Sequence, residues 1–303
     1  LAGPTNNSAI GDGEDTDFGM RRAELVLKGK GPGTWNWVLG YDARADKFLD
    51  VNVNYKFNGF TFIQVGQYKQ PNSFEELSST KNNDFISKAM TTNLQGVARR
   101  VGLAAGTGAD NWTVTGSVFT REMTRNLGEG NGWGARGTWA PILDTGSILH
   151  LGLSYVSYDA RDSGSAPGAT PVFDGDNRAR WRVRPDADLT GTRLVDSGQF
   201  TDADQNSTLG VEGAWVHGPI KLQAEYMKTN TSRELHDDFD FDSWYVSGVW
   251  NITGETWGYK DGVVVTTLPN EPGSGMWQLA ARYDQGIGDR PGLGVPSRGH
   301  CEC

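Results

Sequence analysis

The feature that most constrains the fold is an alternation of apolar and polar residues that recurs along most of the chain. The clearest case is residues 51–57, which read VNVNYKF, with apolar side chains at the odd positions and polar ones at the even positions. Successive side chains of an extended strand point to opposite faces, so such a strand has one apolar and one polar face. Asn58 and Gly59 follow, a pair typical of tight hairpins. The sequence therefore predicts antiparallel strands joined by turns.

Similar segments recur about twelve times between residues 17 and 283, each roughly nine to eleven residues long. Short turns alternate with longer connections, of which residues 68–93 and 159–207 are the longest. Strands of this length, with apolar faces rich in tryptophan and tyrosine, are typical of an antiparallel transmembrane β-barrel. We therefore predict an all-β fold of this class. The pattern alone also leaves open a soluble β-sandwich that binds carbohydrate on exposed tryptophans, or a multi-repeat β-protein.

Composition and charge exclude several functions. The net charge of −9 argues against a nucleic-acid partner. Glu75 and Glu76 are adjacent carboxylates, but in a strand they would point to opposite faces. A hydrolase that uses two carboxylates needs both of them to face the same substrate. The tail residues His300, Cys301 and Cys303 have no second group of metal ligands elsewhere. We predict no enzyme activity, no catalytic residue, no metal site and no cofactor.

The segment RARWRVR places four arginines at alternate positions, Arg178, Arg180, Arg182 and Arg184. In a strand their guanidinium groups would line one face as a ladder. Such a face can neither contact lipid nor pack unpaired into a dry core. The ladder therefore indicates contact with water or anions, either on a pore wall or on a solvated hairpin arm in an exterior loop.

Several longer segments occur in a characteristic order. They include FGMRRAELVLKG from Phe18, WNWVLGYD from Trp35, VGQYKQPNSFEEL from Val65, LHLGLSYVSYD from Leu149, and GAWVHGPIKLQAEYM from Gly213. In their order and spacing the chain resembles the phosphate- and polyphosphate-selective porins of Gram-negative outer membranes, from about Thr16 to Asp284. The resemblance implies a sixteen-stranded, homotrimeric porin in contact with outer-membrane lipid and lipopolysaccharide, through which small anions diffuse passively.

Compared with the sixteen strands that this resemblance implies, we expect the first strand and the last three to be missing from the chain. We therefore expect residues 1–303 to form one incomplete barrel domain with about twelve of the strands. Residues 285–303 show no alternation and are expected to be a non-native or disordered tail.

The resemblance also implies roles for individual residues. Residues 68–93 correspond to an inward loop that narrows the pore, with charged residues Glu75, Glu76, Lys81 and Lys88. The anion pathway would contain Arg182, Arg184 and Lys260, extended by Arg22, Arg178 and Arg180, although Arg22 could instead lie at the lipid interface. Three family lysines are replaced by Asn36, Gln64 and Glu76, and Asp186 replaces a ladder arginine. Because Glu76 would reverse the local field, we expect a weakened anion preference.

Overall fold

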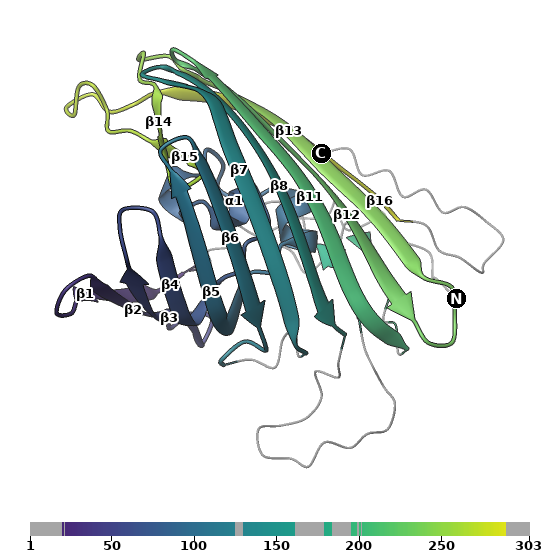
Figure 1. Cartoon of the computed structure of the whole chain (residues 1–303). Helices are drawn as coiled ribbons and strands as arrows, with labels where there is room; N and C mark the ends of the chain where they lie inside the picture. The colour runs from purple at the N-terminus through teal and green to yellow at the C-terminus, as the bar shows by residue number, and fades with distance from the viewer. Residues whose placement is uncertain are drawn as a thin grey trace.

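The protein is built on one curved sheet of twelve antiparallel strands, in which strands adjacent in the sheet follow one another along the chain (Figure 1). The computed structural model describes residues 20, 22–124, 130–160, 179–183, 195–198, 200 and 202–288. The prediction of about twelve barrel strands is confirmed. The strands are β1 (Glu24–Lys30), β2 (Trp35–Asp42), β3 (Lys47–Lys56), β4 (Phe62–Lys69), β5 (Arg99–Ala109), β6 (Trp112–Phe119), β7 (Gly132–Asp144), β8 (Ser147–Asp159), β11 (Ala203–His217), β12 (Ile220–Arg233), β13 (Phe239–Asn251) and β16 (Gln278–Gly288).

The two faces of this sheet have the opposite character to those of a soluble protein. Large apolar side chains are exposed on the convex face, and they include Trp37, Val53, Val65, Val114, Trp139, Leu153, Val211, Leu222 and Trp250. Buried positions on the concave face are largely polar or charged, and they include Asn52, Ser117, Arg136, Thr208, Glu212, Lys221, Glu225 and Ser243. An outward apolar band around a polar interior is the arrangement that a barrel needs in lipid.

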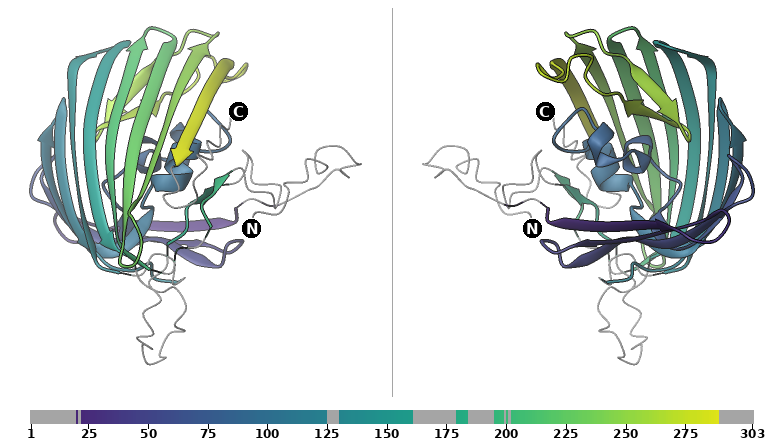
Figure 2. Two further views of the ribbon diagram at one scale, coloured as in Figure 1. Left: turned by 90° about the vertical axis from the view of Figure 1, so that its right-hand side faces the viewer. Right: turned by 90° about the vertical axis from the view of Figure 1, so that its left-hand side faces the viewer.

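The concave side of the sheet holds a folded segment, which we call the inward loop (residues 70–98) (Figure 2). It contains two short helices, α1 (Phe74–Leu77) and α2 (Met90–Gln95), and the 3-10 turn η2 (Thr80–Asn82). The sequence predicted a loop at 68–93, and the observed bounds differ from these. Strand β4 continues to Lys69, and the chain leaves α2 only at Gln95.

Two small hairpins also lie outside the main sheet. In the β14–β15 hairpin, β14 (Trp257–Lys260) pairs with β15 (Val263–Thr266), and the sequence did not predict it. Within the connection between β8 and β11, β9 (Arg182–Val183) pairs with β10 (Val195–Asp196). That connection is shorter than the predicted 159–207, because β8 includes Asp159 and β11 begins at Ala203.

The predicted start of the tail, residue 285, is too early. Strand β16 continues to Gly288 and pairs with β13 along its length, from Gln278 opposite Asn251 to Gly288 opposite Phe241. Residues 289–303 lie outside the described part of the chain.

The alternative of a soluble sugar-binding sandwich is wrong. A sandwich needs two packed sheets, whereas the main sheet is single and its concave side is occupied by the inward loop. The outward tryptophans are spread over separate strands, from Trp35 on β2 to Trp250 on β13, and do not converge on one cleft. In the described ranges, no helix is long and apolar enough to cross a membrane.

Candidate functional site

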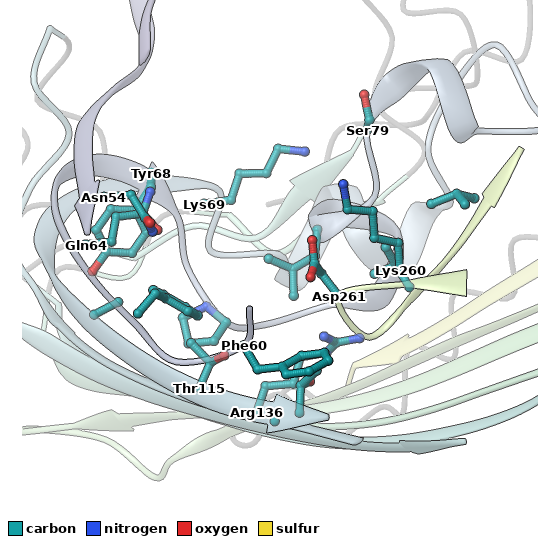
Figure 3. Close-up of a pocket in the computed structure, with 18 of the residues that line it drawn as sticks. Asn54, Phe60, Gln64, Tyr68, Lys69, Ser79, Thr115, Arg136, Lys260 and Asp261 are labelled. Atoms are coloured by element: carbon teal, nitrogen blue, oxygen red, sulfur yellow. The ribbon is translucent and has the colours of Figure 1, made fainter. Parts of the chain in front are cut away.

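A cavity of about 630 Å³ lies between the wall strands β3–β6, the inward loop and the β14–β15 hairpin (Figure 3). Its charged lining residues are mostly basic: Lys56, Lys69, Lys81, Arg136, Lys260 and Asp261. Five cations and one carboxylate thus surround this cavity in a chain whose net charge is −9. Two of the five, Lys69 and Arg136, are paired with Glu76 and Glu212. Lys56, Lys81 and Lys260 still leave net positive charge beside the cavity, where an anion would be stabilised.

The tip of the β14–β15 hairpin is seated on the wall. Asp261 and Gly262 both have positive φ, 52° and 75°, as expected for a two-residue turn of type I′. A Cβ at Gly262 would lie 2.8 Å from the Oγ1 atoms of both Thr113 and Thr138, so only glycine allows this approach. Arg136 donates a hydrogen bond of 2.8 Å from Nη2 to the Gly262 carbonyl. These contacts hold the neighbouring hairpin residues at the edge of the cavity.

The buried carboxylate of Glu212 connects the hairpin and the inward loop to the wall. It accepts hydrogen bonds from Arg136 Nε at 3.0 and 3.3 Å, and lies 3.0 Å from His150 Nε2. The other ring nitrogen of His150 is 2.8 Å from the hydroxyl of Tyr259 in β14. The His150 ring also stacks on Phe74 of α1, with centroids 4.6 Å apart. One carboxylate therefore orients two groups that contact both inward elements.

A second buried carboxylate fixes the start of α1. Glu225 on β12 accepts a 2.9 Å hydrogen bond from the Phe74 amide and a 3.2 Å bond from the Ser73 hydroxyl. Ser73 has a positive φ of 68°, which is uncommon for a residue with a side chain. The wall thus holds the loop in a backbone conformation that the loop sequence alone would rarely adopt.

Further contacts fasten the inward loop to β12 and β16. Asp284 on β16 accepts a 2.8 Å hydrogen bond from the Met90 amide at the start of α2. Lys221 on β12 forms a 2.5 Å ion pair with Asp84 of the loop, and both side chains are buried. These contacts fasten the loop to β12 and β16, and the cavity lies beside the loop and β3–β6.

The two glutamates of α1 have different environments, and neither lines the cavity. Glu75 is buried, which raises its carboxyl pKa, although the Ala89 amide donates to it at 2.6 Å. Burial also acts on Glu76, but the ammonium groups of Lys88 and Lys69 outweigh it and lower the pKa of Glu76. The expectation that Glu76 reverses the field in the pore needs correction, because its charge is buried between two lysines.

Comparison with known proteins identifies the group to which this architecture belongs. The family model for the phosphate-selective porins O and P matches residues 5–290. The chain belongs to this family. Porin O of Pseudomonas aeruginosa is 24% identical over 296 residues, which cover 88% of this chain and 65% of that protein. An uncharacterized protein of Caulobacter vibrioides is 27% identical over 282 residues, covering 88% and 54%.

The chain therefore spans between about half and two thirds of the length of these two relatives. Among solved structures, a loop-deletion mutant of OmpT, an outer membrane protein of Vibrio cholerae, matches with a TM-score of 0.50 at 12% identity. That alignment covers 88% of this chain and 73% of the OmpT chain, and it supports the fold alone. Family and fold together place this protein in the outer membrane of a Gram-negative bacterium.

The predicted pathway residues of this porin occupy different places. Lys81 and Lys260 line the cavity. Arg22 donates a 2.8 Å hydrogen bond to the Thr80 hydroxyl in η2, so it lies beside the inward loop. Lys88 pairs with Glu76 and does not line the cavity. Only part of the predicted set therefore meets at one site.

The described part of the arginine segment, residues 179–183, lies on the concave side of the wall, and we call the segment the arginine arm. Arg180 and Arg182 are exposed, whereas Trp181 and Val183 are buried against α2, Phe239 and Phe241, as the alternation predicted. The Trp181 indole donates a 3.0 Å hydrogen bond to Thr231 on the inner face of β12. Arg180 is bound to Asp196 of β10 at 2.8 and 2.5 Å. Arg178 and Arg184 lie outside the described residues.

Sequence reasoning missed three of the porin's cavity cations, Lys56, Lys69 and Arg136. Each lies in a wall strand, β3, β4 or β7. The alternation of apolar and polar residues could have revealed Lys56 and Arg136 as inward-facing, because each lies on the polar side of its strand. Their convergence on one cavity required the curvature of the sheet and the path of the inward loop.

Proposed function

We propose that this porin is a passive diffusion channel for small hydrophilic solutes and that it prefers anions. The observation that carries the proposal is the basic lining of the 630 Å³ cavity. Within the described part of the chain, Lys56, Lys81 and Lys260 have no ion-pair partner, so their charges remain available to a solute. Side-chain charge sets ion selectivity where a pore is narrow.

The inward loop serves as the constriction in this proposal. Lys81 on η2 and Lys260 on the hairpin contact the passing anion, and Arg22 adds positive charge beside η2. The arginine arm, Arg178–Arg184, collects anions, since guanidinium stays charged and offers several donors to oxyanions. Phosphate is one such anion suggested by the family description, and a homotrimer in lipid and lipopolysaccharide is the assembly that we propose.

Planar bilayers test this function. Protein extracted from outer membranes is reconstituted, and the reversal potential is measured across a potassium chloride gradient. We expect the sign of the reversal potential to show that chloride is more permeant than potassium. The double variant Lys81→Gln, Lys260→Gln is expected to lower the chloride-to-potassium permeability ratio about fivefold, which corresponds to about 1 kcal/mol of lost attraction.

Lys228→Gln is the control, because Lys228 lies on the outer face of β12 and pairs with Asp240 at 3.9 Å. It is expected to leave the ratio unchanged. A wild-type channel that prefers potassium would overturn the proposed anion preference.

A further inference from the structure

The cavity is lined by apolar side chains as well as by lysines. Phe60, Phe62 and Tyr68 contribute from the β3–β4 connection and β4, and Leu77, Val263 and Val265 from the inward loop and β15. The interior of a water-filled barrel is normally polar. Apolar surface left facing water forgoes the free energy that burial would provide. Phe60, Phe62, Leu77, Val263 and Val265 keep exposed surface, and this surface indicates a solute that covers it.

The apolar lining is built into the wall. A Cβ at Gly106 would lie 2.5 Å from the Phe62 ring, so the absence of a side chain at Gly106 allows the ring to lie against the inner face of β5. Tyr68, six residues along β4, is 5% exposed and also lines the cavity. Phe60, at the turn before β4, is 41% exposed and has its ring at the cavity edge. Packing holds Phe62 and Tyr68 in place.

Cations and apolar groups share the same open space. Figure 3 shows Phe60 and Tyr68 around the space into which Lys69 and Lys260 extend. Lys56 lies at the end of β3, four residues before Phe60, and both line the cavity. A solute in this space can thus meet a lysine and an apolar surface at once.

We propose that the cavity selects small organic anions, in which a carboxylate or phosphate is attached to an aromatic or other apolar body. This inference rests on the proposed anion channel and names its solute class. A cavity of about 630 Å³ lies within the size range of small-molecule sites. Inorganic phosphate would satisfy the lysines and leave the apolar lining uncovered, whereas phenyl phosphate would satisfy both.

The test compares phenyl phosphate with inorganic phosphate as blockers of chloride current through the reconstituted porin. Both carry a phosphate group, so their difference reports the phenyl ring. We expect phenyl phosphate to reach half-block at about tenfold lower concentration, the effect of covering one small apolar group. Phenol, which is neutral at pH 7, is expected to block poorly.

The variant Phe60→Ser, Val265→Thr removes apolar surface and keeps every lysine. It is expected to bring the two half-block concentrations within about twofold of each other. Phe57→Ser is the matched control, since Phe57 is 58% exposed in the same connection and does not line the cavity. It should keep the tenfold difference.

Equal block by the two phosphates in the wild-type porin would overturn the organic-anion proposal and leave anion preference intact. A preference for phenyl phosphate that persists in Phe60→Ser, Val265→Thr would overturn the assignment to this cavity. A cation-selective wild-type channel would instead overturn the proposed function itself.

Discussion

Two sides of the porin's interior use charge in different ways. On the paired side, the inner face of β7, β8, β11–β13 and β16, charged groups such as Arg136 with Glu212 and Lys221 with Asp84 are buried together. On the cavity side, beside β3–β6, Lys56 and Lys81 line open space, with no ion-pair partner among the described residues. The first arrangement fixes the inward loop and hairpin, and the second leaves charge for a solute.

The difference shows that a polar barrel interior has two separate tasks. A buried ion pair contributes little net stability compared with an apolar pair, but removing one partner is costly. An exposed lysine contributes little to stability, so it can be exchanged at small cost. Substitutions on the paired side should therefore change folding, and those on the cavity side should change transport.

The largest expected effect is on the paired side. Arg136→Met leaves the Glu212 carboxylate buried without its guanidinium partner and frees the Gly262 carbonyl. We expect the free energy of unfolding to fall by about 3–5 kcal/mol. Urea unfolding in detergent micelles, followed by tryptophan fluorescence, measures the loss.

Lys56→Met is the matched change on the cavity side and is expected to stay within about 0.5 kcal/mol of the wild type. The double variant Arg136→Met, Glu212→Leu removes both charges and should recover much of the lost stability. Equal stability losses for Arg136→Met and Lys56→Met would remove the distinction between the two sides.

An intermediate effect, dependent on pH, is expected within α1. The raised pKa of Glu75 means that the folded protein binds its proton more tightly than the unfolded chain does, so stability is lost as pH rises through that pKa. Glu75→Gln should therefore unfold at a higher temperature than the wild type at pH 7. This advantage should disappear below the ordinary carboxyl value of 4.5.

Glu76→Gln is the matched variant with the opposite sign. The lowered pKa of Glu76 contributes stability above 4.5, which is lost as pH falls through the pKa of the folded state. This variant should unfold at a lower temperature at pH 7, and the gap should close in acid. Thermal unfolding of both variants across this pH range measures the two trends. If the unfolding temperatures of both variants changed with pH in the same direction relative to the wild type, Glu75 and Glu76 would not have pKa shifts of opposite sign.

The smallest expected effect separates two arginines of the arm. Arg180 forms two hydrogen bonds with Asp196. Arg182 lies opposite Asp196 in the β9–β10 pair, and within the described residues no hydrogen bond joins the two. Arg182→Ala should lower chloride conductance more than Arg180→Ala, by a few tens of per cent in dilute salt, and the difference should vanish near 1 M salt because of screening. Single-channel conductance at several salt concentrations measures it. A larger loss of conductance in Arg180→Ala would show that the ion pair with Asp196 does not weaken the attraction of Arg180 for anions.

The sequence predicted the wall of this molecule better than its interior. Alternation depends on local geometry, so residues 51–57 revealed both their strand and its two faces. The β14–β15 hairpin was missed although its Asp261-Gly262 pair is a hairpin signal, because the flanking strands are only four residues each.

The environment of Glu76 could not be predicted, because it depends on tertiary structure. Lys69 and Lys88 lie seven residues before and twelve after it, and only the folded path of the inward loop brings all three together. The same reason explains Arg180 and Asp196, which meet only when β9 pairs with β10. Alternation reveals which face a charge occupies, whereas its partner is decided by the path of the loops.

The separation of the β14–β15 hairpin from the main sheet has an evolutionary consequence. The hairpin contributes Lys260, Val263 and Val265 to the cavity, yet it forms a sheet of its own. Provided that Gly262 is kept for the seat on the wall, neighbouring positions can mutate without disturbing lipid contacts or strand register. A protein of this design can therefore come to admit a different solute through a few substitutions in the hairpin, while the strands of its membrane wall keep their sequence.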